Sequence, residues 1–174
     1  MFFDLEMTGG NCALDEILQL TLVDMFKGVI FNEYIRPKKC KSWKETEKIH
    51  HITPEMVQNC PTLKDFQHEI KKALTNADVM VGYGIENDLR FMKKNKLFAG
   101  RRTIIYDLQR SFSRLCSSNS DMPSLQSCAH YCACPSFGTV HNSLTDACMI
   151  IYCFSVLYGL EVPHWLRSFS GNLK

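Results

Sequence analysis

The first ten residues, MFFDLEMTGG, constrain the fold of this chain more than any other stretch. An apolar run leads into Asp4 and Glu6, which are one residue apart, and the breaker Thr8-Gly9-Gly10 follows. Because successive side chains of a β-strand alternate between its two faces, both carboxylates of such a strand project from the same face. Two anions so close repel each other, and a bound cation is the usual way to keep both ionised. The stretch predicts a strand that ends either in a cation site or in a solvated acidic turn, and these ten residues alone do not separate the two.

Length and composition favour a single globular domain. A chain of 174 residues is long enough for one sizeable core, and its contents of 45% hydrophobic and 22% charged residues are ordinary. The net charge of +2 is too small to indicate nucleic-acid binding by itself. No apolar run reaches the length of a membrane span, and an acid at position 4 does not fit a signal peptide, so we expect no membrane association.

The nine cysteines indicate a reducing compartment, so we expect an intracellular protein of the cytoplasm or nucleus with mostly buried free thiols. A zinc cluster is the alternative interpretation of one segment, which contains Cys128, His130, Cys132 and Cys134, with His141 following. This segment has no Cys-x-x-Cys pair, and Cys128 and Cys132 have the spacing of one face of an amphipathic helix. We therefore expect core thiols here.

Hydrophobic periodicity and breakers predict the elements along the chain. Besides the opening strand, alternating or short apolar runs predict strands over 17–24, 29–35, 79–81 and 103–106. Helices are predicted from 54, over 62–74 and 87–96, from 108, and over 124–131 and 143–158. Residues 37–48 are predicted as a basic loop, 116–120 as a Ser-rich loop and 159–174 as a tail without clear period. Three antiparallel strands followed by alternating helices and strands predict an α/β fold: one mixed five-stranded sheet with helices on both faces.

Two further acids stand where ligand groups converge in such folds. Asp88 follows a predicted buried strand and a Gly-broken turn, at the carboxyl end of a strand. An aspartate in the first turn of a helix is also favoured by the helix dipole without any function. Asp146 lies in the first turns of the last long helix, and His141 lies five residues earlier. Since positions i and i+5 of a helix diverge by roughly 140°, His141 must lie in the preceding loop if both side chains face one site.

The order of these motifs resembles the DEDDh 3′→5′ exonuclease superfamily, which includes the proofreading subunit of bacterial DNA polymerase III, RNase T, oligoribonuclease and the three-prime repair exonucleases. Asp4-x-Glu6 followed by Thr-Gly, Asp88 after a Val-Gly turn, and His141-x4-Asp146 are similar to its three exonuclease motifs. Segments 32–37 and 49–54 are similar to the family's intervening segments, and the resemblance covers about residues 2–158.

The resemblance implies an RNase H-like fold and removal of nucleotides from the 3′ end of DNA or RNA, with two Mg²⁺ or Mn²⁺ ions per site. It implies an exonuclease domain over 1–158. The tail 159–174 is expected to pack on that domain through Trp165 and Phe169, because lone exposed aromatic side chains are unfavourable. Asp4, Glu6, Asp88 and Asp146 would hold the metals, and His141 would take the proton from the attacking water. Single-stranded 3′ ends are the expected substrate, nucleoside monophosphates are the product, and a homodimer is a possible assembly.

The substrate contacts are inferred from the same resemblance. The backbone of Met7, Thr8 and Gly9 is expected to line the terminal nucleotide, with His51 and Tyr83 close to the same pocket. Lysines at 38–48 and 93–96, with Arg101 and Arg102, are candidates for phosphate contacts or for a merely solvated surface.

Two positions depart from the family pattern, because Tyr83-Gly84 replaces a frequent His-Asn and Gln19 replaces a frequent Glu. Neither departure removes a metal ligand. The alternative function is a catalytically inactive exonuclease-like scaffold that binds nucleic acid or a protein partner. It is disfavoured because inactive members are expected to lose ligands, and all five catalytic-type residues are present.

Overall fold

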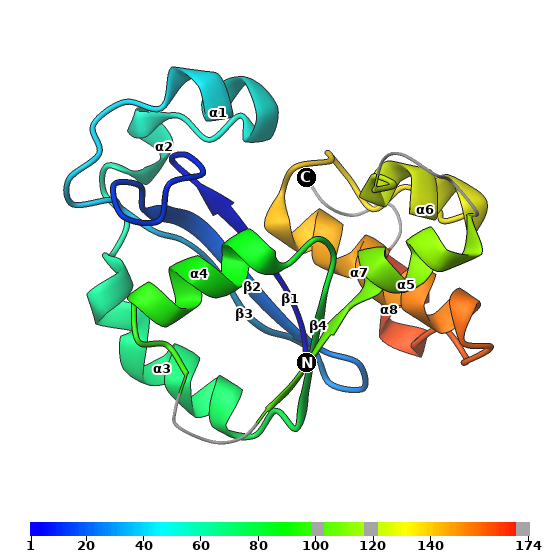
Figure 1. The fold of residues 1–174 in the computed structure, drawn as a ribbon. Helices are drawn as coiled ribbons and strands as arrows, with labels where there is room; N and C mark the ends of the chain where they lie inside the picture. Colours follow the sequence, from blue (N-terminus) through cyan, green and yellow to red (C-terminus); the bar gives the residue numbers. More distant parts are fainter. Residues whose placement is uncertain (99–102, 117–121, 170–174) are drawn as a thin grey trace.

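A computed structural model of the chain describes residues 1–98, 103–116 and 122–169, and its centre is a five-stranded mixed sheet (Figure 1). The strands are β1 (Phe2–Met7), β2 (Ile17–Asp24), β3 (Gly28–Tyr34), β4 (Val79–Gly82) and β5 (Ile104–Asp107). Their order in the sheet is β3-β2-β1-β4-β5. The first three strands are antiparallel, and β4 runs parallel to both β1 and β5. The predicted mixed sheet with an antiparallel start is confirmed.

Helices cover both faces of the sheet (Figure 1). Those in the described residues are α1 (Lys44–His50), α2 (Pro54–Val57), α3 (Leu63–Thr75), α4 (Glu86–Lys94), α5 (Leu108–Leu115), α6 (Leu125–Tyr131), α7 (Ser143–Leu157) and α8 (His164–Phe169). Buried residues of α3 and α4 form one core against the sheet, and buried residues of α5 to α8 form a second core on its other face. A third, smaller cluster packs around Trp43 beside α1 and α2.

The central strand β1 separates these two cores. Phe3 and Leu5 are buried in the α3/α4 core, whereas Phe2 is buried in the core that α7 shares. Because strand side chains alternate, Asp4 and Glu6 lie on the same side as Phe2, toward α7. One face of β1 therefore builds core along its whole length, and the other face presents two carboxylates.

Most predicted elements are confirmed, and two segments differ. The predicted basic loop contains α1, and the tail without clear period contains α8. A helix such as α1, with mostly exposed polar side chains, has no apolar stripe for periodicity to detect. The predicted Ser-rich loop lies, apart from Cys116, outside the described residues.

The described part of the tail contacts the rest of the chain. Leu166 of α8 is fully buried, and the indole Nε1 of Trp165 donates a 2.9 Å hydrogen bond to the carbonyl of Met25. The division into a domain over 1–158 and a tail stays a prediction, since 170–174 are not described. Within the described ranges, none of the helices has both the length and the apolar character that a bilayer crossing requires.

Candidate active site

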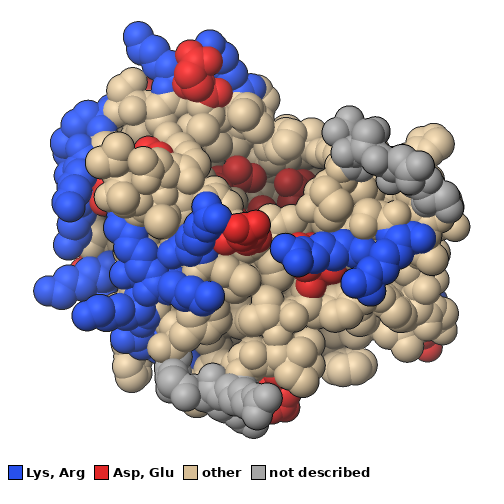
Figure 2. All heavy atoms as spheres, in the orientation of Figure 1, with Lys and Arg blue, Asp and Glu red and all other residues tan. Residues whose placement is uncertain are grey.

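Three carboxylates meet at the carboxyl end of β1. Asp4 and Glu6 come from the strand, and Asp146 comes from the first turn of α7. One carboxylate oxygen of each lies within 4.8 Å of the other two. Asp146 is only 7% exposed, and its Oδ1 atom is buried without a hydrogen-bond partner. Figure 2 shows acidic side chains recessed in a hollow near the centre of this face. A buried acceptor without a partner is costly, so this oxygen fits a site that takes a cation.

The fourth predicted acid, Asp88, is the third residue of α4 and is 8% exposed. It is not one of the three acids within 4.8 Å of one another, but its charge raises the pKa of both Asp4 and Glu6. The fold thus brings all four predicted acids, which are far apart in the sequence, into one electrostatic cluster.

Burial is the main reason why each acid of this cluster has a raised pKa. It raises the pKa of Glu6 to about 9, with repulsion by Asp146 and Asp88 adding to it. The pKa of Asp88 rises to about 7, with Asp107 as the second cause, and that of Asp146 rises to about 6. The pKa of Asp4 lies well above its ordinary value for the same reason, reinforced by its three acidic neighbours. Ionising all four carboxyl groups at once is unfavourable, and a bound divalent cation would offset their mutual repulsion.

These shifts predict a stability that falls with pH in the absence of metal. Folded Glu6 keeps its proton up to about pH 9, whereas unfolded Glu6 loses it near 4.5, so folding stability is lost as pH rises between these values. We expect a lower Tm at about pH 8 than at about pH 5 in EDTA, and a larger Mg²⁺-induced rise in Tm at pH 8, because metal competes with protons. Thermal unfolding with and without Mg²⁺ measures both. An equal Mg²⁺ effect at the two pH values would contradict the metal site.

The loop before α7 carries His141, as the sequence predicts. His141 is half-buried and precedes the helix by two residues. Its backbone has a φ of 59°, a left-handed conformation that is uncommon for a residue other than glycine. A hydrogen bond from the backbone N–H of His141 lowers the pKa of Asp146 against the effect of burial. The charge of the His141 ring lowers the pKa of His50. His141 therefore lies close to both the acidic cluster and a second histidine.

That second histidine, His50, was missed by the sequence analysis, which named His51. His50 is 7% exposed, and its Nδ1 accepts a 3.0 Å hydrogen bond from the backbone N–H of Ile52. Nε2 therefore carries the ring proton and donates to the carbonyl of Met7 at 3.2 Å. Burial lowers the pKa of His50, which keeps the ring neutral and this pair of bonds intact. His51 lies exposed at the left-handed C-terminal cap of α1, and its predicted substrate contact stays a prediction.

The turn after Glu6 is fixed by a small polar network. The hydroxyl of Thr8 donates to Asp15 at 3.1 Å and accepts from the backbone N–H of Glu16 at 3.0 Å. The carbonyl of Thr8 accepts from the hydroxyl of Thr46. A Cβ at Gly9 would lie 2.5 Å from the Asp15 carboxylate, so glycine is required for this packing. The backbone of the predicted substrate-binding segment is therefore held in one conformation beside the acids.

The side chain of Tyr83 connects two segments of the fold. Its hydroxyl donates to the carbonyl oxygens of Pro123 at 2.8 Å and Ser124 at 2.9 Å, which ties the end of β4 to the start of α6. Its predicted role near the substrate is not tested by these contacts and stays a prediction.

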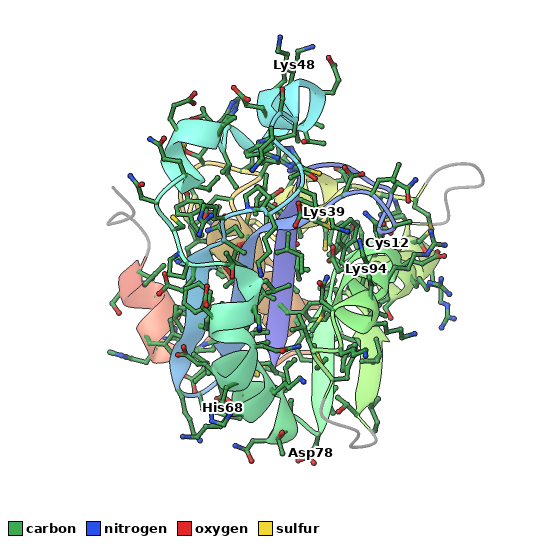
Figure 3. All side chains as sticks on the ribbon, turned by 90° about the vertical axis from the view of Figure 1, so that its left-hand side faces the viewer. Cys12, Lys39, Lys48, His68, Asp78 and Lys94 are labelled. Atoms are coloured by element: carbon green, nitrogen blue, oxygen red, sulfur yellow. The ribbon has the colours of Figure 1, made fainter. Side chains whose placement is uncertain are left out.

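The predicted phosphate-contacting lysines lie in two places on the surface. Lys39 and Lys94 line one pocket of about 340 Å³ on the face seen in Figure 3, whereas Lys48 lies on α1. Arg101 and Arg102 lie outside the described residues.

Buried hydrogen bonds dock the start of α7 on β2, opposite the two strand acids. Thr21, which pairs with Asp4 in the sheet register, shares a 2.6 Å hydrogen bond with the hydroxyl of Ser143. Gln19, which pairs with Glu6, accepts from the backbone N–H of Ser143 at 3.2 Å. Gln19 therefore works as a positioning residue that sets the helix carrying Asp146 against β1.

Replacing Thr21 with valine, which keeps the shape but removes the hydroxyl, should destabilise the fold by about 1–3 kcal/mol. The hydroxyl contacts both Asn32 and Ser143, and its removal leaves buried polar atoms with fewer partners. Urea unfolding measures the loss. Thr103→Val is the matched control, because that hydroxyl makes one 3.2 Å bond to Ala77 away from the site. Equal losses in the two variants would contradict a special role for this network.

Comparison with known proteins identifies the family of the chain. The RNase T family model, described as an exonuclease, matches residues 1–154. An uncharacterised exonuclease of Schizosaccharomyces pombe is 34% identical over 91 residues, which cover 52% of this chain and 14% of that protein. A PolC-type DNA polymerase III of Clostridium perfringens is 30% identical over 102 residues, covering 57% of this chain and 7% of that protein. The chain thus spans about one seventh or less of these relatives.

Solved structures share the fold at low identity. Exonuclease I matches with a TM-score of 0.74 at 18% identity, covering 92% of this chain and 40% of that one. Exonuclease X in complex with 5′ overhanging duplex DNA matches with a TM-score of 0.65 at 18% identity, covering 98% of both chains. The family model covers residues 1–154, which is most of the chain. The chain belongs to the RNase T family of exonucleases.

Proposed function

We propose that this chain is a metal-dependent 3′→5′ exonuclease that releases nucleoside monophosphates from DNA or RNA. The observation that carries the proposal is the meeting of Asp4, Glu6 and Asp146 within 4.8 Å, with a buried oxygen of Asp146 left without a partner. A structural core would not gather charges whose pKa values burial raises this far.

The donor set fits a hard cation. All four candidate ligands, Asp4, Glu6, Asp88 and Asp146, offer carboxylate oxygens, which favour Mg²⁺ or Mn²⁺ over softer metals. Two such ions, when bound, would neutralise charge at the phosphodiester and lower the pKa of a bound water. Asp88 lies outside the tight group of three but acts electrostatically on Asp4 and Glu6, so it would serve as a further ligand for such ions.

The protein's own residues supply the remaining steps. His141 would accept the proton of the attacking water, which its place in the loop beside Asp146 allows. His50 holds the carbonyl of Met7, so the backbone of Met7 to Gly9 is fixed where the terminal nucleotide would lie.

The expected substrate is a single-stranded 3′ end, because a recessed site must enclose one phosphate at a time. Among the proteins that share the fold, Escherichia coli exonuclease I has been solved with a dT13 oligonucleotide, and exonuclease X with a 5′ overhanging duplex. These complexes support nucleic-acid ends as ligands and leave the choice of DNA or RNA to experiment.

The test uses 5′-labelled single-stranded DNA, duplex DNA and RNA with Mg²⁺ or Mn²⁺, resolved by length. We expect a ladder that shortens from the 3′ end and nucleoside monophosphates as product, with none in EDTA. A substrate blocked by a 3′-terminal phosphorothioate linkage is the control for direction. Metal-supported binding without any shortening of all three substrates would favour the inactive scaffold instead.

A further inference from the structure

Three buried thiols meet between α6 and α7, away from the acidic site. Cys128 lies on α6, Cys132 caps the C-terminus of α6, and Cys153 lies on α7. Their Sγ atoms all lie within 4.8 Å of one another, and each side chain is 5% exposed or less. Cys128 and Cys132 are four residues apart, which places them on one face of the helix toward Cys153.

A fourth thiol, from Cys134, lies at the edge of this group. Ala133 turns the chain with a φ of 52°, so Cys134 comes back toward the helices two residues after Cys132. Its thiol donates to the carbonyl of Pro135 at 3.5 Å and lies close enough to Cys153 to raise the pKa of that thiol. The residue is half-buried. Three thiols from α6, its C-terminal cap and α7 therefore meet, and a fourth thiol lies at their edge.

We propose that Cys128, Cys132, Cys134 and Cys153 bind one structural Zn²⁺ ion. With Zn–S bonds of about 2.3 Å, the sulfurs of a tetrahedral site are roughly 3.8 Å apart. The thiols of Cys128, Cys132 and Cys153, which lie within 4.8 Å of one another, need shifts of about 1 Å or less, and Cys134 would move in as the fourth ligand. Soft thiolates select zinc over the hard ions that suit the acidic site. Zinc offsets two of the four thiolate charges, and Cys134 at the half-buried edge leaves the site partly open to water.

The arrangement differs from ordinary core packing of cysteine. A single buried thiol behaves as a small hydrophobe, but here thiols contact thiols, which are weak hydrogen-bond partners for one another. Burial raises the pKa of Cys132 to about 11, whereas hydrogen bonding to Cys153 lowers the pKa of Cys128. Zinc would displace the proton of each ligand thiol that holds one. The ligand set also corrects the zinc alternative of the sequence, since His130 is exposed and His141 lies beside Asp146.

Zinc at this position would join two parts of the catalytic scaffold. It would tie α6 to α7, the helix that carries Asp146, and close the 132–142 connection that carries His141. The ion would thus stabilise the geometry of the acidic site without contacting the substrate.

The first test is the zinc content of the full chain, purified without a polyhistidine tag and under reducing conditions. We expect about one zinc per chain, and a loss of about tenfold or more in Cys128→Ser and in Cys153→Ser. Cys148→Ser is the matched control, because Cys148 is equally buried on α7 but outside the group. Asp146→Asn should keep its zinc, which separates this site from the acidic one. Loss of zinc from Cys148→Ser to the same extent would overturn the ligand assignment.

A second test uses the wild-type protein and therefore does not depend on whether a variant folds. Cobalt substitution of the wild-type protein should give the strong visible bands of tetrahedral cobalt and a thiolate-to-cobalt charge-transfer band, which carboxylate ligands do not produce. Titration of the thiols in denaturant gives the oxidation state of the nine cysteines. Zinc-free protein with all thiols free would show a purely apolar cluster, and zinc-free protein with two thiols fewer would show a disulfide. Either result would overturn the proposal, whatever the nuclease assays give.

Discussion

Asp4→Asn is expected to slow 3′→5′ cleavage on the order of 10³-fold or more while the chain stays folded. The amide keeps the size of the side chain but removes a negative ligand, and bound metal ions contribute several kcal/mol to the transition state, at about 1.4 kcal/mol per tenfold. Burial raises the pKa of the Asp4 carboxyl well above its ordinary value in metal-free protein, so an amide replaces a group whose neutral form is favoured. The Tm in EDTA should therefore stay the same or rise, whereas Mg²⁺ should no longer raise it.

The measurement is kcat on a 5′-labelled single strand at saturating Mg²⁺, together with the Tm in EDTA and in Mg²⁺. Glu69→Gln is the matched control, because this acid is exposed on α3 and should leave both quantities unchanged. Asp4→Asn with wild-type turnover would remove Asp4 from the metal site. A Tm that collapses in EDTA would assign Asp4 a structural role.

His141→Asn is expected to lower kcat by about 10²- to 10⁴-fold, the usual contribution of a general base. Asparagine tolerates the left-handed backbone found at this position, so the loop should keep its shape. Because His141 is assigned as a base and not as a metal ligand, the rise in Tm on adding Mn²⁺ should match that of the wild type. Added imidazole should restore part of the lost rate.

His68→Ala is the control for general effects of losing an imidazole, since His68 is exposed on α3 at the end of the molecule far from α1 (Figure 3). A His141→Asn variant that loses Mn²⁺ binding would make His141 a ligand. A His141→Asn variant that cleaves at the wild-type rate would show that another group accepts the proton. His50 is a poor candidate, because both of its ring nitrogens are already hydrogen-bonded, to Met7 and to Ile52.

Local pattern was sufficient to predict the sheet and the two strand acids. Alternation along β1 places Asp4 and Glu6 on one face, and hydrophobic periodicity predicts the helices α3 and α7. Such features depend on neighbours a few residues apart, which a sequence displays directly. The prediction that Asp88 and Asp146 join the two strand acids in one site came from the resemblance to the exonuclease superfamily, because local pattern does not relate residues so far apart in the sequence.

Contacts between distant segments were out of reach of local pattern. Nothing in the sequence shows that Cys153 of α7 meets Cys128 of α6, because both also fit as apolar core positions. The choice of His50 over His51 depends on where α1 ends, and α1 has no apolar stripe that would reveal it. The docking of Gln19 on Ser143 requires knowing that α7 crosses β2.

The most direct test of the central claim is an anomalous difference map from crystals grown with Mn²⁺ and a nucleoside monophosphate. The account predicts manganese peaks in contact with Asp4, Glu6 and Asp146, with Asp88 within reach of the same pair of ions. A map without manganese between these side chains, in crystals whose soaking solution saturates the Mn²⁺-induced rise in Tm, would contradict it.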